Sequence, residues 1–196
     1  MMDAGFLSEA APDPQAQLMF DEDVADFGAV MNVSRLWAYQ PASFFGLVDL
    51  LRQSSVAHGI SGRQRGILVA ACASTLGDSY CSLSWGTKLA AKTDVATAAG
   101  VIRGEDSALT PAEQAIARWA RKVARWPQQT TEEDVRGLRD AGFTDRQIFG
   151  VTLFVALRVA FSSVNGALGV RPDAFFRELA PQPVLDAVTF GRPIAS

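Results

Sequence analysis

The chain has 196 residues, 48% of them hydrophobic, which is long enough to bury one sizeable core and too short for two comfortable domains. Its formal net charge of -3 excludes the electrostatic footprint of a nucleic-acid or anionic-membrane binder, so small molecules and protein chains are the expected partners. Two cysteines form no disulfide framework, and the first residues lack the basic-then-apolar order of a signal peptide, so we expect a cytoplasmic protein.

The N-terminal part of the chain divides into an arm and a helical region. Residues 1–20 contain two prolines and no sustained apolar period, which predicts an arm, with a single all-α domain over residues 21–196. Apolar residues at helical spacing from Val24 to Met31 predict a first helix. A second helix should begin at Pro41 and stop at Gly59.

A helical hairpin is predicted at about residues 61–93. Ser61 is a suitable N-cap for an apolar helix that Gly77 ends, and Asp78 is a suitable N-cap for the next helix. Cys81 would then lie in the first turn of that second helix. The two helices should pack antiparallel, with Gly77 and Asp78 at the turn.

The second half of the chain continues the helical pattern. Capping residues precede four further apolar-periodic segments, at Thr93 or Asp94, Thr110, Thr131 and Thr144. The last segment holds the longest apolar run, 148–164, which Arg158 interrupts and which is shorter than the roughly 20 residues of a membrane-spanning helix. We read this run as a buried core or interface helix. Strand signals are nearly absent, so the fold class predicted is all-α.

Cys81 is the first candidate for chemistry. Free backbone N–H groups and the positive end of the helix dipole favour a thiolate at this position, whereas the nearby Asp78 carboxylate opposes it. The direction of the Cys81 pKa shift is therefore open. A lone cysteine is also often a small buried hydrophobic residue, and that structural alternative stays open too.

The string from Gly77 to Gly86, the Ala-Gly-Phe-Thr-Asp segment at 141–145 and the closing apolar helix resemble the carboxymuconolactone decarboxylase and alkyl hydroperoxidase D-like superfamily, over roughly residues 20–170. This resemblance implies a single-domain helical bundle built around the hairpin at 61–93. It also implies self-assembly, commonly into trimers or multiples of trimers, and a small-molecule substrate.

The chain departs from the pattern of the peroxidases of that superfamily, which use Cys-x-x-Cys-x-x-x-His and a glutamate on the preceding helix. Cys81 matches the second cysteine, but Asp78 replaces the first and Trp85 replaces the histidine. No acidic residue lies between Asp49 and Asp78, so the glutamate is missing as well. The usual means of forming the thiolate and of reducing its sulfenic acid are therefore absent.

Three further residues could complete a site. Cys72 lies on the other arm of the hairpin and is a candidate resolving thiol, although its neighbours suggest a packing seam of small residues. Trp85 shares a helix face with Asp78 and Cys81 and could cover an apolar ligand or only fill the core. Arg158 could bind a carboxylate or form an ion pair across a subunit interface.

The function predicted from these residues is a thiol-dependent peroxidase or related oxidoreductase, with Cys81 and Asp78 as catalytic residues and Trp85 and Arg158 as binding residues. Two alternatives remain: a non-redox lyase or decarboxylase-like enzyme, and a catalytically dead oligomeric binding or scaffold protein. No metal-ligand cluster, phosphate loop or cofactor motif stands out, so neither a metal nor a cofactor is expected. The only histidine, His58, is expected to be structural because it lies outside the motif.

Overall fold

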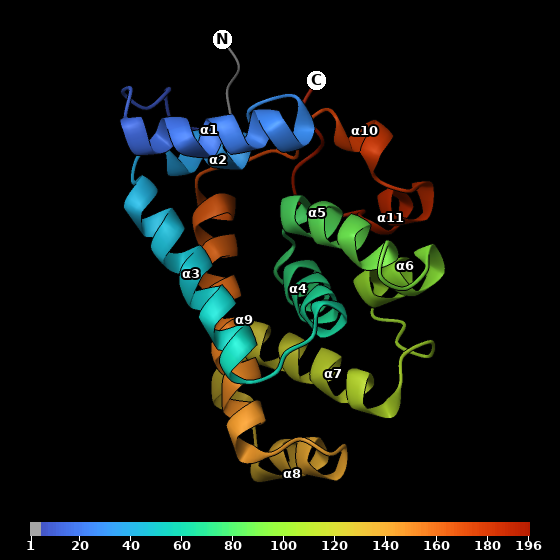
Figure 1. The fold of residues 1–196 in the computed structure, drawn as a ribbon. Helices are drawn as coiled ribbons and strands as arrows, with labels where there is room; N and C mark the ends of the chain where they lie inside the picture. The colour runs from blue at the N-terminus through green and yellow to red at the C-terminus, as the bar shows by residue number, and fades with distance from the viewer. Residues whose placement is uncertain (1–4) are drawn as a thin grey trace.

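A computed structural model describes residues 5–196 of the chain (Figure 1). Within this part the chain is helical and contains no strand, which confirms the all-α prediction. The elements in order are α1 (Pro14–Phe27), α2 (Asn32–Trp37), α3 (Pro41–Ala57), α4 (Gly62–Leu76), α5 (Ser79–Ala90), α6 (Val95–Arg103), α7 (Pro111–Arg125), a 3-10 turn η1 (Pro127–Gln129), α8 (Glu132–Asp140), α9 (Asp145–Ala167), α10 (Phe176–Leu179) and α11 (Gln182–Ala187).

Helix α4 is at the centre of the molecule and packs against α5, α6, α7 and α9. Its residues 66–73 are all buried, and most of them are small. Small side chains let neighbouring helices approach closely. At Gly66, for example, an added Cβ would lie 3.0 Å from the Leu89 side chain of α5. This close packing holds the α4–α5 hairpin rigidly inside the bundle.

The hairpin has the caps that the sequence predicts. Ser61 and Gln64 form a capping box at the start of α4, and Gly77 ends the helix in the left-handed conformation at φ 71°. Asp78 then caps α5, so the chain reverses within two residues. The N-cap hydrogen bonds of α4 and α5 join residues three positions apart, so the local sequence is enough to predict them.

The N-terminal arm predicted over residues 1–20 is wrong from Pro14 onward, and its residues 1–4 lie outside the described part of the chain. Asp13 caps α1, whose Ala16 and Met19 are only 2% exposed and pack against Ala38. These two apolar residues are too few to form a periodic pattern, although they are buried in the structure. The helix expected to continue to Met31 ends instead at Phe27.

Three short helices, α2, α10 and α11, were not predicted. Gly28 adopts φ 75° and ends α1, and α2 follows after four residues. Helices α10 and α11 have four and six residues, so neither is long enough to show an amphipathic period. They pack against α5 and α6, where Phe176 and Val184 are buried.

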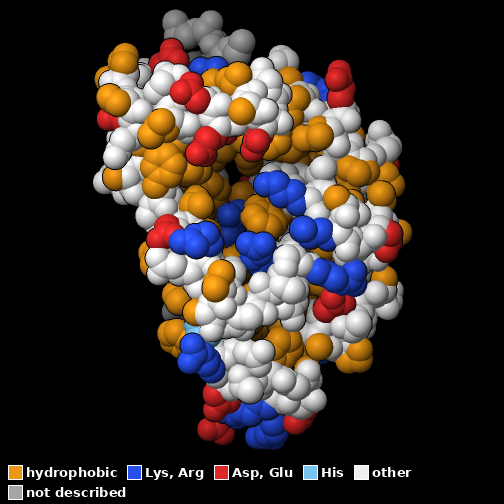
Figure 2. All heavy atoms as spheres, viewed as in Figure 1, with side chains coloured by type: hydrophobic (Ala, Val, Ile, Leu, Met, Phe, Trp, Pro, Cys, Tyr) orange, Lys and Arg blue, Asp and Glu red, His pale blue; other side chains and the backbone are white. Residues whose placement is uncertain are grey.

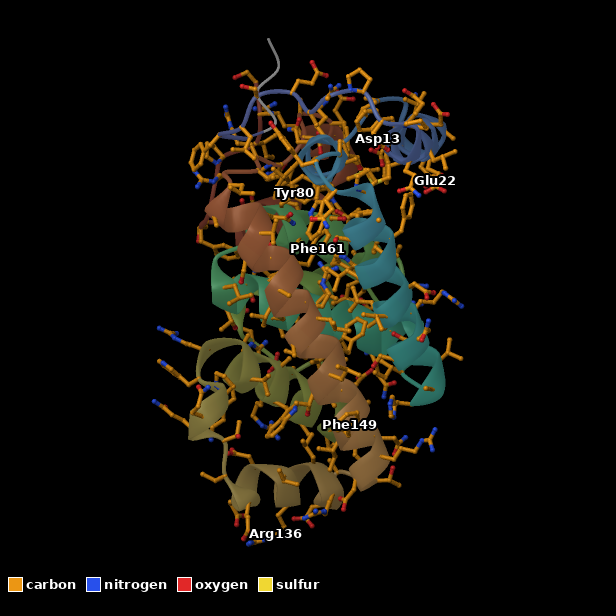
Figure 3. The ribbon with its side chains drawn as sticks, turned by 90° about the vertical axis from the view of Figure 1, so that its left-hand side faces the viewer. Asp13, Glu22, Tyr80, Arg136, Phe149 and Phe161 are labelled. Carbon is orange, nitrogen blue, oxygen red and sulfur yellow. The ribbon has the colours of Figure 1, made fainter. Side chains whose placement is uncertain are left out.

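Helix α9 runs the length of the molecule beside α3, with Phe161 in its upper half and Phe149 in its lower half (Figure 3). By length and composition alone it could cross a membrane, a property that core helices share. One face packs against α3, α4 and α7 and buries Arg158, Ser162 and Asn165. The helix therefore presents polar groups to the interior of the bundle.

Candidate functional site

The start of α5 holds Cys81 in a fixed position. Oδ1 of the capping residue Asp78 accepts a hydrogen bond from the backbone N–H of Cys81 across 2.9 Å. Cys81 occupies the first turn, as predicted, and is 2% exposed. The thiol is thus presented at the amino end of a helix but away from bulk solvent.

Arg158 of α9 reaches across to this thiol. Its Nη2 donates a hydrogen bond to Cys81 Sγ at 3.1 Å, and its guanidinium lies over the rings of Trp85 and Phe161 at 5.5 and 4.8 Å from their centroids. Arg158 is 6% exposed, and no carboxylate of the described residues forms an ion pair with it. The sequence identified Arg158 as unusual but carried no signal that its partner would be a sulfur 77 residues away.

The surroundings set the protonation state of the thiol. Burial raises the pKa of Cys81 well above its usual value, and the charge of Asp78 together with its interaction with the thiol raises it further. Arg158 and the hydroxyl of Ser162 lower this pKa, but not enough to reverse the shift. In the free protein at neutral pH the sulfur is therefore a thiol that accepts a hydrogen bond from a cation.

Five buried polar side-chain atoms on α9 and at the start of α5 have no hydrogen-bond partner in the described part of the chain. On α9 they are Arg158 Nε, Ser162 Oγ and Asn165 Nδ2, which share one helix face at i, i+4 and i+7. On the α5 side they are Asp78 Oδ2 and Ser82 Oγ. Buried polar atoms in proteins are nearly always paired, so these five are exceptions that water or the polar groups of a ligand would satisfy.

A cavity of about 330 Å³ opens beside Trp85. Arg65 of α4 and Lys88 and Lys92 at the end of α5 line it together with the half-buried Trp85 ring. Figure 2 shows a hollow in this face of the molecule, with basic side chains gathered around an apolar centre. Trp85, predicted as a binding residue, therefore lines the cavity and also contacts Arg158, whereas neither Arg158 nor Cys81 is among the residues that line it.

The other two residues singled out in the sequence do not line the cavity beside Trp85. Cys72 is a free, buried thiol in the core of α4, where burial raises its pKa to about 12. It forms no disulfide with Cys81, and its role as a resolving thiol stays a prediction. His58 packs against Gly150 of α9, where a Cβ would overlap its ring.

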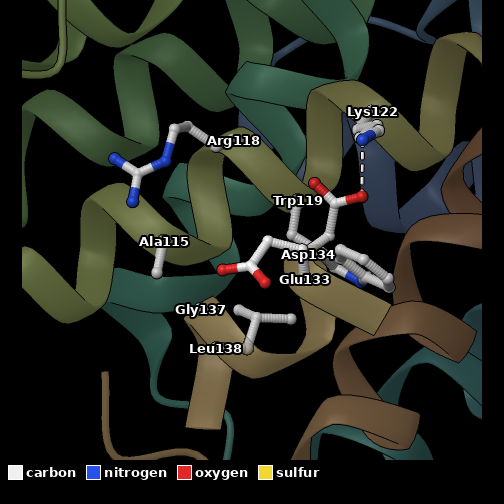
Figure 4. Close-up of a pocket in the computed structure, with 8 residues that line it drawn as sticks. All are labelled: Ala115, Arg118, Trp119, Lys122, Glu133, Asp134, Gly137 and Leu138. Atoms are coloured by element: carbon white, nitrogen blue, oxygen red, sulfur yellow. Dashed lines mark hydrogen bonds and ion pairs between the residues drawn. The ribbon is translucent and has the colours of Figure 1, made fainter. Parts of the chain in front are cut away.

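A second cavity, of about 350 Å³, lies between α7 and α8 (Figure 4). It also combines basic residues with a tryptophan, namely Arg118, Lys122 and Trp119. Here, however, Asp134 forms an ion pair with Lys122, and Glu133 adds a second carboxylate. Its charges are therefore partly compensated, in contrast to those of the cavity beside Trp85.

Comparisons with known proteins define the fold. No protein-family model matches the sequence, and no curated protein matches it. An uncharacterized peroxidase-related protein from Silicibacter sp. TM1040 superimposes with a TM-score of 0.78 at 19% identity, over 89% of this chain and 95% of that one. A protein described as an alkylhydroperoxidase AhpD core, from Ralstonia eutropha JMP134, gives 0.76 at 20% identity, over 90% and 96%.

The debrominase Bmp8 is also similar. A cysteine-to-alanine variant of it, in complex with 2,3,4-tribromopyrrole, superimposes with a TM-score of 0.71 at 15% identity, over 96% of this chain and 98% of that one. At these identities the likeness concerns the fold. The chain therefore has the all-α fold of the alkylhydroperoxidase AhpD core, which confirms the fold that the resemblance in the sequence implies.

Proposed function

We propose that this protein is a thiol-dependent oxidoreductase that reduces small organic hydroperoxides through Cys81. The observation that carries the proposal is the hydrogen bond from Arg158 to Cys81 Sγ at 3.1 Å. A buried cation with no carboxylate partner is costly unless it stabilises a negative charge during function. The charge that forms closest to it is the thiolate of Cys81.

Asp78 and Arg158 have different roles in this mechanism. Asp78, whose Oδ2 is buried and unpartnered in the described structure, accepts the proton of the thiol while Arg158 stabilises the thiolate. The sulfur attacks the terminal oxygen of the hydroperoxide, the O–O bond breaks, and the alkoxide takes the proton from Asp78. The products are the sulfenic acid of Cys81 and an alcohol, so one oxygen atom has been transferred.

The cycle closes with two molecules of an external thiol. The first condenses with the sulfenic acid, releases water and forms a mixed disulfide, and the second releases Cys81 as a thiol together with an external disulfide. The external thiol thus takes the role of the resolving cysteine of the Cys-x-x-Cys pattern, whose position Asp78 occupies in this chain.

Hydroperoxide consumption in the presence of excess small thiol tests the proposal. Cys81→Ser should abolish turnover, and a sulfenic-acid probe should label Cys81 of the wild-type protein alone. Cys72→Ser is the matched comparison, because it removes the other buried thiol: turnover that persists supports reduction of the sulfenic acid by the external thiol rather than by Cys72. Equal turnover by wild type and Cys81→Ser would remove the thiol from the mechanism.

A second candidate function is thiol-dependent debromination of a small aromatic compound. The flat Trp85 ring, which lines a cavity and contacts the same Arg158 that donates to Cys81, favours it, and the similar structure of Bmp8 holds a brominated pyrrole. The net reaction converts one aryl bromide and two thiols into the unsubstituted ring, a disulfide, bromide and a proton. Release of bromide from 2,3,4-tribromopyrrole that depends on Cys81, without hydroperoxide turnover, would favour this candidate over the first.

Self-association belongs to the same proposal. Phe149 of α9 is 64% exposed, and Val56 near the end of the adjacent α3 is 74% exposed. Apolar side chains exposed on neighbouring helices support an interface between copies of the chain. Sedimentation of wild type and Phe149→Glu should show an oligomer that the variant weakens, and a monomeric wild type would refute this part.

A further inference from the structure

Four basic side chains gather around Trp85, and none of them is neutralised. They are Arg65, Lys88, Lys92 and Arg158. Eight ion pairs join other residues in the described part of the chain and engage none of these four. An uncompensated group of four cations is unexpected in a chain whose net charge is -3.

Two of the cations lie close to the Trp85 ring. Lys88 Nζ lies 5.2 Å and Arg158 Cζ lies 5.5 Å from the ring centroid. A third, Arg65, has its Nε buried without a hydrogen-bond partner and lines the cavity next to the ring. The guanidinium thus has an unused donor beside an apolar face that can stack with a planar ligand.

The cations also repel one another. Desolvation lowers the pKa of Lys88, and repulsion from Arg158 lowers it further. The carboxylate whose charge acts in the opposite direction is Asp26 of α1, but it forms no ion pair with Lys88. An anion in the cavity would relieve this repulsion and supply the missing acceptor for Arg65.

We propose that the cavity beside Trp85 binds a small aromatic carboxylate, with the carboxylate between Arg65 and Lys88 and the ring against Trp85. The volume of about 330 Å³ is at the lower end of the range of small-molecule sites, which suits a ligand of one or two rings. This proposal concerns binding alone, so it holds whether or not Cys81 turns over hydroperoxides.

Calorimetric titration of the whole protein with 2-naphthoate tests the site. Naphthoate should bind with a 1:1 stoichiometry, and its neutral amide should bind at least about tenfold more weakly, because a hydrogen bond between charged groups contributes roughly 1.5–3 kcal/mol. Inorganic phosphate, which has the charge but not the ring, should compete poorly. Affinity for naphthoate should fall as salt is added.

Variants separate this site from general attraction to a basic surface. Lys88→Met should weaken naphthoate binding by about tenfold or more, and since Lys88 forms no hydrogen bond or ion pair in the described part of the chain the variant should fold normally. Arg65→Met and Trp85→Leu should also weaken binding. The control is Arg118→Met, which changes an arginine beside Trp119 in the cavity between α7 and α8 and should leave the affinity unchanged.

Four outcomes would overturn the proposal. They are absence of naphthoate binding at millimolar concentration, equal affinity for the amide, full competition by phosphate, and an Arg118→Met effect as large as that of Lys88→Met. Loss of hydroperoxide turnover in any variant would say nothing against it, because the readout is binding to the unreacted protein.

Discussion

Replacing Arg158 with methionine isolates the electrostatic role of the guanidinium. Methionine keeps an unbranched apolar side chain against Trp85 and Phe161 but removes the donor 3.1 Å from Cys81 Sγ. A hydrogen bond to a charged group contributes roughly 1.5–3 kcal/mol, which corresponds to about one to two pKa units. The pKa of Cys81, already raised by burial, should therefore rise further in the variant.

Alkylation of Cys81 by iodoacetamide at pH 8, followed by mass spectrometry, measures this shift. A higher pKa lowers the thiolate fraction by about 10- to 100-fold, but the more basic thiolate is also the better nucleophile, with a Brønsted coefficient of roughly 0.4–0.5. The net rate should fall by about 3- to 15-fold. Arg118→Met serves as the control, because its arginine lies in the other cavity.

The same variant should keep its stability. Replacing a buried charge that has no carboxylate partner with an apolar residue is often neutral or stabilising, so the free energy of unfolding should change by less than about 2 kcal/mol. Chemical denaturation checks this. An alkylation rate equal to that of wild type, in a variant with unchanged stability, would refute the assignment of Arg158 as the group that stabilises the thiolate.

Three further predictions concern residues around the hairpin and α9. Asp78→Asn removes a charge that raises the Cys81 pKa, so alkylation of Cys81 should become faster. Hydroperoxide turnover should fall, because the variant lacks the base, and a change of both rates in the same direction would contradict that role. The pKa of Cys72 is raised from 9.0 to about 12 in the folded protein. Above about pH 9 only the unfolded chain loses this proton, so the free energy of unfolding should fall with rising pH, by at most about 4 kcal/mol from this residue. Urea denaturation of Cys72→Ala should show a smaller loss. Gly150→Ala should cost about 1–3 kcal/mol because the added methyl overlaps the His58 ring, and thermal melts should show less effect in a His58→Ala background.

The features that could be predicted from the sequence alone are those that depend on local hydrogen bonds. The caps at Ser61, Asp78, Thr110 and Thr144 each join residues three positions apart. The helix starts, the turn at Gly77 and the place of Cys81 in the first turn of α5 could therefore all be predicted. The start of α1 carries the same kind of local signal, the cap Asp13 followed by Pro14, and the prediction of an arm over residues 1–20 overlooked it.

Only the tertiary structure decided the chemistry of the site. Arg158 was identified in the sequence as a cation inside an apolar helix, but its contact with Cys81 depends on how α9 and α5 are held by α4 between them. The direction of the Cys81 pKa shift likewise depends on burial, which the helix position alone leaves open. Both properties arise from groups far apart in the chain, and distances between such groups are set by packing rather than by sequence spacing.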